Sequence, residues 1–172
     1  MGVTEKSAVR RLLTFPDPVN EYAARGVAAG VVVMSATYVL TGWWWVLALL
    51  ASGFVARVAS GPRFSPLGLF VTKVAVPRLG LPTRLTPGPP KRFAQAIGAT
   101  LSLAAVVALI GFDTAGPSRV LIAMILVAAS LEAFVGFCLG CWIFARLMRA
   151  GFIPEAVCEA CADLSRQRPV HS

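Results

Sequence analysis

The clearest chemical pattern in this chain comes from its four cysteines, which form two pairs, Cys138/Cys141 and Cys158/Cys161. Each pair has C-x2-C spacing, and 16 residues separate the pairs. Four thiols in this arrangement can bind a metal ion, cycle through a disulfide or transfer sulfur. Because residues i and i+3 of a helix share a face, the two thiols of each pair would lie together. The pattern predicts one site built from two close thiol pairs.

Several interpretations of these thiols stay open. In one, Cys138 and Cys141 form a redox pair, although a position late in a long helix lacks the help of a helix N-terminus. In another, a short C-terminal helix over 154–163 folds back, so that Cys138, Cys141, Cys158 and Cys161 bind structural zinc tetrahedrally. In the last, the first pair simply packs as small apolar side chains.

Glu132 is the one acidic residue inside a predicted membrane span. A carboxylate in that position must be paired, protonated or in contact with water. On a continuous helix its side chain points away from the cysteines and into the helix bundle, for a structural hydrogen bond or for proton or ion transfer. Small residues on helix faces, which permit close helix packing, are Gly136 and Gly140 on this span and Gly26 and Gly30 on the first.

The composition indicates an integral membrane protein. Hydrophobic residues make up 57% of the chain and charged residues 14%, and the mean hydropathy is +0.74, whereas soluble domains carry roughly 25% charged residues. The frequent Arg, Ala, Val and Gly are typical of a bacterium with GC-rich DNA. Apolar runs predict four transmembrane helices arranged as two hairpins, at about 26–40, 43–58, 93–112 and 120–148.

The distribution of positive charge predicts the orientation. Of 16 Lys and Arg residues, all but Arg119 lie in the N-terminal segment, between the second and third spans, or after the fourth. The positive-inside rule therefore places both termini and the central loop in the cytoplasm, with Trp43, Trp44 and Trp45 at the outer interface of the plasma membrane. This topology accounts for the net charge of +8 without nucleic-acid binding, and contact with anionic lipid headgroups is its simplest use.

Three regions follow from this topology. Residues 1–25 form a cytoplasmic N-terminal segment, 26–148 a membrane domain, and 149–172 a cytoplasmic cysteine-containing tail. Within the membrane domain, 59–92 is a cytoplasmic or interfacial loop. Its part 65–78 is too short to span and predicts an interfacial helix, whereas the prolines of 81–90 oppose regular helix.

Three segments together resemble one protein family. They are Phe15-Pro-Asp-Pro-Val-Asn-Glu21 followed by Arg25, Gly88-Pro-Pro-Lys-Arg-Phe-Ala-Gln95, and Gly136-Phe-Cys-Leu-Gly-Cys141. They resemble the bacterial domain-of-unknown-function family 4395 over about residues 15–150, and the cysteine-containing segment is the most specific part. The resemblance implies a small integral membrane protein and carries no activity. Cys158 and Cys161 lie beyond it.

The residues together favour a membrane protein with a four-cysteine site at its cytoplasmic face. The leading hypothesis is thiol–disulfide or sulfur-relay chemistry with a soluble thioredoxin-like or rhodanese-like partner. The alternatives are a non-enzymatic membrane scaffold whose tail is held by zinc, and a small transporter or channel that uses Glu132. Homo-oligomers are compatible with each hypothesis.

Overall fold

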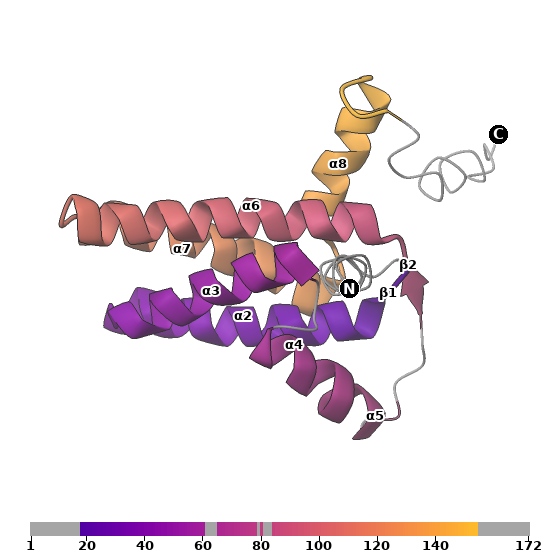
Figure 1. Ribbon diagram of the computed structural model, residues 1–172, viewed down its shortest axis with the longest axis horizontal. Coiled ribbons are helices and arrows are strands. Elements are labelled where there is room, and N and C mark those ends of the chain that lie inside the picture. The colour runs from indigo at the N-terminus through magenta and orange to yellow at the C-terminus, as the bar shows by residue number, and fades with distance from the viewer. Residues whose placement is uncertain (1–17, 61–64, 79, 81–83, 155–172) are drawn as a thin grey trace, which may run out of the picture.

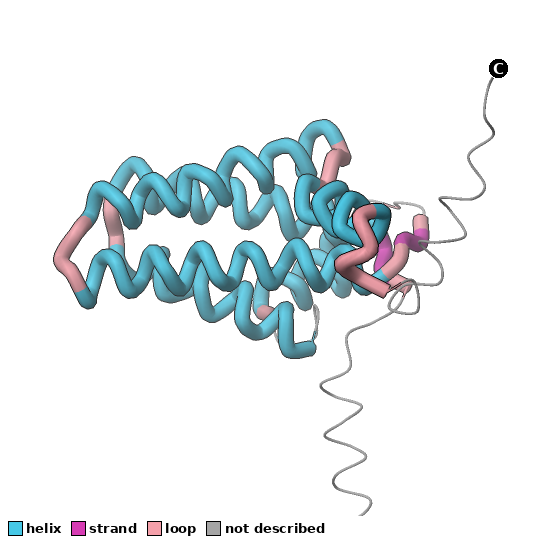
Figure 2. Tube along the Cα trace, turned by 90° about the horizontal axis from the view of Figure 1, so that it is seen from above, coloured by secondary structure: helices cyan, strands magenta, loops and turns pink. Residues whose placement is uncertain are grey.

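Four helices lie side by side in the computed structural model, which describes residues 18–60, 65–78, 80 and 84–154. Helices α2 (Glu21–Thr41), α3 (Trp44–Ser60), α6 (Gly88–Val106) and α7 (Ala115–Ser130) form the bundle (Figures 1 and 2). The π-helical segments η3 (Val107–Gly111) and η4 (Leu131–Val135) extend α6 and α7. The chain is therefore mostly helical, as its apolar runs predict.

Three of these helices, within the described residues, are long and apolar enough to cross a membrane. They are Glu21–Thr41, Gly88–Gly111 and Ala115–Val135, while Trp44–Ser60 is apolar but shorter. Aliphatic side chains face outward along them, which suits a lipid environment; examples are Val33, Leu49, Leu103, Val107, Met124 and Val127. The protein thus has the helices of a membrane protein.

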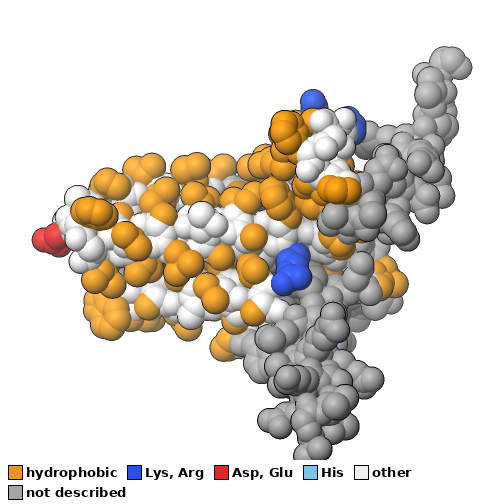
Figure 3. Space-filling view, turned by 45° about the horizontal axis from the view of Figure 1, so that its top comes forward, with side chains coloured by type: hydrophobic (Ala, Val, Ile, Leu, Met, Phe, Trp, Pro, Cys, Tyr) orange, Lys and Arg blue, Asp and Glu red, His pale blue; other side chains and the backbone are white. Residues whose placement is uncertain are grey.

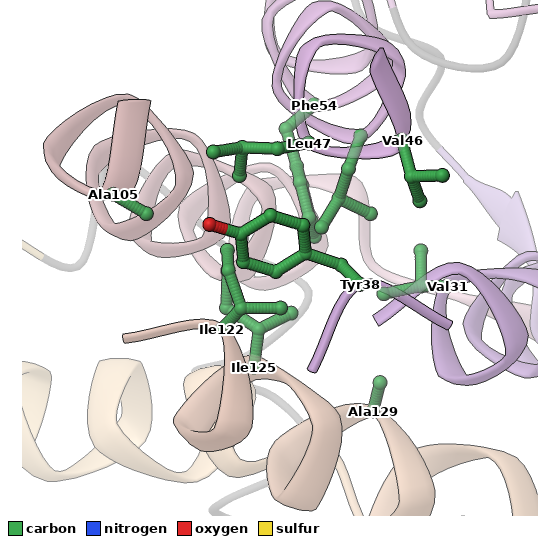
Figure 4. Packing of buried hydrophobic residues seen from close by; sticks show 10 residues of the cluster. Val31, Tyr38, Val46, Leu47, Phe54, Ala105, Ile122, Ile125 and Ala129 are labelled. Carbon is green, nitrogen blue, oxygen red and sulfur yellow. The ribbon is translucent and has the colours of Figure 1, made fainter. Parts of the chain in front are cut away.

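We call the end of the bundle where short loops join α2 to α3 and η3 to α7 the turn end. Buried apolar side chains pack together at this end. Tyr38, Leu47 and Ile122 are at most 1% exposed and come from three different helices. Figure 4 shows the Tyr38 ring between Leu47 and Ile122. The Tyr38 hydroxyl is 2.6 Å from the Ser118 hydroxyl oxygen, so this buried polar group is hydrogen-bonded, as buried polar groups must be.

A second, shorter helical segment leaves the bundle after α3 (Figure 1). It consists of α4 (Pro66–Phe70), η2 (Val71–Ala75) and α5 (Val76–Arg78), as predicted for 65–78. Its attachment uses Arg57, which is 4% exposed and donates hydrogen bonds to Gln95 (2.9 Å) and Ser65 (3.2 Å). These polar partners therefore hold Arg57 inside the protein, although it lies near the end of an apolar helix.

Two predicted helix boundaries are wrong. Regular helix was not expected before residue 91, yet α6 begins at Gly88. Pro89 and Pro90 fit the first helical turn because the amide hydrogens that they lack have no partner there. In addition, the predicted fourth span over 120–148 is interrupted after Val135, and a separate helix, α8 (Leu139–Arg149), follows.

A short two-stranded ladder closes the other end of the bundle. Strand β1 (Val19–Asn20) pairs antiparallel with β2 (Leu85–Thr86). The Asn20 side chain caps α2 by accepting the amide hydrogen of Tyr22 at 3.0 Å, a common role for asparagine. The ladder holds the beginnings of α2 and α6 together.

Candidate functional site: a thiol pair at a helix break

The candidate site lies where the chain bends between η4 and α8. Gly136 adopts the left-handed conformation with φ +77°, which ends η4, and glycine has no Cβ to oppose this conformation. Cys138 is extended and becomes the N-cap of α8. Figure 1 shows α8 leaving the bundle at a steep angle. The bend therefore converts a position late in one helix into the start of another.

Cys138 and Cys141 are in direct contact at this helix start. The Cys138 sulfur accepts the Cys141 amide hydrogen at 3.4 Å and the Cys141 thiol hydrogen at 2.7 Å. Neither residue is in a disulfide. The expectation that this pair lacks the help of a helix N-terminus is wrong, because Cys138 is the N-cap of a new helix, where partial positive charge favours a thiolate.

The two thiols are chemically unequal. The hydrogen bond from Cys141 lowers the pKa of the Cys138 thiol below its ordinary value and outweighs burial, which acts the other way. The same hydrogen bond, together with burial, raises the pKa of the Cys141 thiol. Cys138 therefore loses its proton more readily than Cys141, which holds its proton more tightly.

An ion pair lies beside the thiols. Lys91 of α6 and Glu132 of η4 are 2.5 Å apart, and their side chains are only 11% and 15% exposed. The Lys91 charge contributes to lowering the pKa of Cys138, and the Glu132 charge opposes it. The interpretation that Glu132 faces away from the cysteines is therefore wrong, since it assumed a continuous helix. We call the region of Lys91, Glu132, Cys138 and Cys141 the thiol end.

Lys91 is the residue that sequence reasoning missed at this site. The sequence pattern places Lys91 in the loop 59–92, because it predicts that the third span begins at about residue 93. The usable signal was the pair Pro89–Pro90, since proline is favoured at the first helical position. A helix that begins at Gly88 places Lys91 within its first turn.

A cavity of about 100 Å³ opens beneath the thiol end, inside the bundle. Its walls are mostly small or aliphatic residues of α2, α6 and α7, and both Glu132 and Cys138 line it, whereas Cys141 does not. The small lining residues include Ala24, Ala28, Ala94, Gly98, Ala128 and Ala129. Protein interiors are normally filled to near crystal density, so a half-open pocket beside a thiol pair is a distinctive feature.

Arg25 stabilises the end of η4. Its guanidinium donates to the carbonyl oxygens of Ala133 (3.2 and 3.3 Å) and Phe134 (3.3 Å), which the helix end leaves without intrahelical partners. Glu21, four residues before Arg25 in the chain, pairs with Arg84 at 3.2 Å instead of with Arg25. Arg25 thus fixes the carbonyl groups that precede the bend.

The glycines predicted for helix packing have different surroundings. A Cβ on Gly26 would lie 2.7 Å from the Val71 side chain, and a Cβ on Gly30 would lie 2.5 Å from that of Leu67. Both glycines therefore face the segment α4–η2. A Cβ on Gly140 would lie 2.6 Å from the Cα of Ala94, so α8 crosses α6 closely there. Gly136 shares no helix face with Gly140, because the helix ends between them.

Charge is unevenly distributed over the molecule. In the space-filling view, apolar side chains cover the length of the bundle, the visible Lys and Arg side chains lie in the half of the molecule that carries α8, and one small acidic spot lies at the opposite end (Figure 3). Cys158 and Cys161 lie outside the described residues. Within the described ranges, no group of three or more His, Cys, Asp or Glu side chains is placed to hold a metal ion.

These features define a mostly helical protein with three helices long and apolar enough to cross a membrane and with a close thiol pair at a helix N-terminus. The chain belongs to the family described as a domain of unknown function, DUF4395, whose sequence model matches residues 19–149. No curated protein and no solved structure is significantly similar to it.

Proposed function

We propose that this protein is a membrane thiol protein whose Cys138–Cys141 pair exchanges disulfides or sulfur with a soluble partner. The observation that carries the proposal is that Cys138 caps α8 while accepting the thiol hydrogen of Cys141 at 2.7 Å. A C-x2-C motif at a helix N-terminus favours the thiolate of its first cysteine, which is the nucleophile in thiol–disulfide exchange.

The proposed reaction uses the two thiols in order. The Cys138 thiolate attacks one sulfur of a partner disulfide, forms a mixed disulfide and releases the partner's other sulfur as a thiolate. Cys141 then gives its proton to the partner thiolate released in the first step and, as a thiolate, attacks the Cys138 sulfur, which releases the reduced partner and leaves a Cys138–Cys141 disulfide. Thioredoxin-like proteins are suitable partners for this exchange, and rhodanese-like proteins for sulfur transfer.

The proposed topology has four transmembrane helices, α2, α3, α6 and α7, as two hairpins in the bacterial plasma membrane. Both termini and the thiol end then face the cytoplasm, where α8 and α4–α5 lie at the membrane interface. The basic residues support this orientation through the positive-inside rule. A reporter fused after Ser172 tests it: activity of a cytoplasm-dependent reporter is expected, and labelling of that extension from outside intact cells would contradict it.

Mixed-disulfide trapping tests the chemistry. With full-length protein in detergent, Cys141→Ser should accumulate a covalent complex with a thioredoxin disulfide, because the resolving thiol is absent. Cys138→Ser should form none, and Cys158→Ser is the matched control that retains the first pair. Equal trapping by Cys138→Ser and Cys141→Ser would contradict the proposed order.

The alternative proposal is a scaffold in which all four cysteines bind one zinc ion. It predicts about one zinc per chain and release of zinc by any single Cys→Ser change. Metal analysis with thiol counting on anaerobically purified protein separates the two proposals: stoichiometric zinc with unreactive thiols would exclude exchange. The weaker transporter proposal requires Glu132 to bind or release a cation, and its pairing with Lys91 at 2.5 Å favours a structural role instead.

A further inference from the structure

We propose that the substrate of this site is sulfane sulfur, held as a persulfide on Cys138 within the cavity beneath the thiol end. The inference rests on the proposed function and names the group that is transferred. It depends on three observations: the size of the cavity, the composition of its walls, and the different positions of the two cysteines.

The size of the cavity restricts what can bind next to Cys138. Its volume is about 100 Å³, whereas an apolar cavity of about 150 Å³ is filled by a single benzene ring. A quinone ring or a peptide thiol such as glutathione would therefore not fit. One added sulfur atom requires about the volume of a water molecule, roughly 30 Å³. The cavity thus suits a small inorganic group.

The walls favour a sulfur atom over water. Ala24, Ala28 and Ala128 expose no hydrogen-bonding side chains, so much of the wall is apolar, while Gln95 and Glu132 are its polar side chains beside Cys138. Persulfide sulfur is polarisable and bonds weakly to water, so it is lost mainly by reaction with other thiols. The small apolar residues of the pocket would shield the outer sulfur from bulky thiols until a partner reaches Cys138.

The position of the charges suits a persulfide anion. Burying an anion in an apolar cavity is costly unless a charge or a donor compensates it. At the thiol end, the compensating donor is the Cys141 thiol, which donates to the Cys138 sulfur at 2.7 Å, while the Lys91 charge is paired with Glu132. Because Cys138 lines the cavity and Cys141 does not, the added sulfur is carried by Cys138.

The transfer is balanced without an external oxidant. The Cys138 thiolate attacks the outer sulfur of a donor persulfide, R–S–SH. A bond forms between the Cys138 sulfur and the outer sulfur, the S–S bond of the donor breaks, and RS⁻ leaves with the electron pair. An acceptor thiolate then attacks the outer sulfur on Cys138, which restores the Cys138 thiolate. Cys141 could instead attack the inner sulfur and release hydrosulfide, and its retained proton slows this loss.

Sulfur loading of the full-length protein tests the inference. Purified, reduced protein is treated with inorganic polysulfide and freed of excess reagent. We expect about one cyanide-reactive sulfur per chain, released as thiocyanate, and a mass increase of one sulfur atom on the Cys138 peptide. Ala128→Leu, which fills the cavity, should shorten the lifetime of this sulfur about tenfold or more, since the filled cavity loses its protective volume. Val127→Leu, on the neighbouring lipid-facing position, should behave like the wild type.

Measuring disulfide formation separates a failure of the persulfide inference from a failure of the proposed exchange function. Reversible formation of the Cys138–Cys141 disulfide in both leucine variants shows that the thiol end is intact in each. If wild-type protein cycles this disulfide but takes up no sulfur, or if Ala128→Leu retains sulfur as long as Val127→Leu does, the inference is wrong and the exchange function stands. If wild-type protein neither cycles the disulfide nor takes up sulfur, both proposals are wrong.

Discussion

The two ends of the helical bundle differ in how they stabilise their chain reversals. At the turn end, the bundle is closed by apolar side chains around Tyr38, whose hydroxyl has a neutral partner in Ser118. At the thiol end, a buried ion pair, two thiols and a cavity replace this packing. Both ends use a glycine in the left-handed conformation, Gly42 and Gly136. The comparison indicates that the turn end is stabilised mainly by apolar packing, whereas the thiol end places buried polar groups beside a cavity.

The largest expected effect comes from breaking the ion pair. Glu132→Leu should lower the free energy of unfolding by about 3–5 kcal/mol, because it leaves the Lys91 charge buried without a partner. Glu132→Gln should cost less, since an amide oxygen still accepts a hydrogen bond from Lys91. Reversible denaturation in detergent measures both. The double variant Lys91→Met/Glu132→Leu should recover most of the lost stability. Equal losses in the single and double variants would show that the Lys91–Glu132 interaction does not account for the effect.

A matched pair of glycine substitutions compares the two bends. Gly136→Ala and Gly42→Ala should each cost about 1–2 kcal/mol, because alanine is disfavoured at φ +77° and +71°. Only Gly136→Ala should change thiol chemistry, since it disturbs the helix start that lowers the pKa of Cys138.

The pH dependence of alkylation measures that difference. The reactive species is the thiolate, so in wild-type protein Cys138 should stay reactive below the pH range of an ordinary thiol and lose reactivity as the pH falls through its lowered pKa. Cys141 should need a higher pH. In Gly136→Ala the Cys138 profile should move to higher pH, whereas in Gly42→Ala it should not. An unchanged pH profile in Gly136→Ala would show that the bend does not lower the pKa of the Cys138 thiol.

Tyr38→Phe tests the turn end alone. It removes the hydroxyl 2.6 Å from Ser118 and leaves that buried hydroxyl without its partner, which should cost about 1–2 kcal/mol. The rate of Cys138 alkylation should not change. A slower or faster alkylation in Tyr38→Phe would show that the two ends are coupled through the bundle.

The smallest effect is expected at the surface ion pair between Glu21 and Arg84. The Arg84 side chain is 74% exposed, and exposed pairs contribute about 0–1 kcal/mol. Arg84→Ala should therefore change stability by less than about 0.5 kcal/mol. By contrast, Arg25→Gln should cost more, because it removes the donor to two carbonyl oxygens next to the bend. A larger loss in Arg84→Ala than in Arg25→Gln would reverse this order.

Apolar runs and charge by themselves determined the class of the protein. Segments of twenty or so apolar residues form helices whatever their neighbours, because the backbone must satisfy its hydrogen bonds within the segment. The same local reasoning located 65–78 as a short helix outside the spans and recognised the family from its motifs. It also selected Glu132 and Cys138 as residues that need a chemical explanation.

Only the tertiary structure decided how the candidate site is assembled. The run 120–148 has no proline and reads as one continuous helix, and Gly136 alone does not predict a break, since glycine also occurs inside membrane helices. The break depends on distant partners: Arg25 binds the carbonyl groups before it, and Ala94 meets Gly140 after it. Lys91 reaches Glu132 only because α6 packs against α7 and α8. Contacts between residues far apart in the chain are not visible in local patterns, and these contacts place a thiolate, a charge pair and a cavity together.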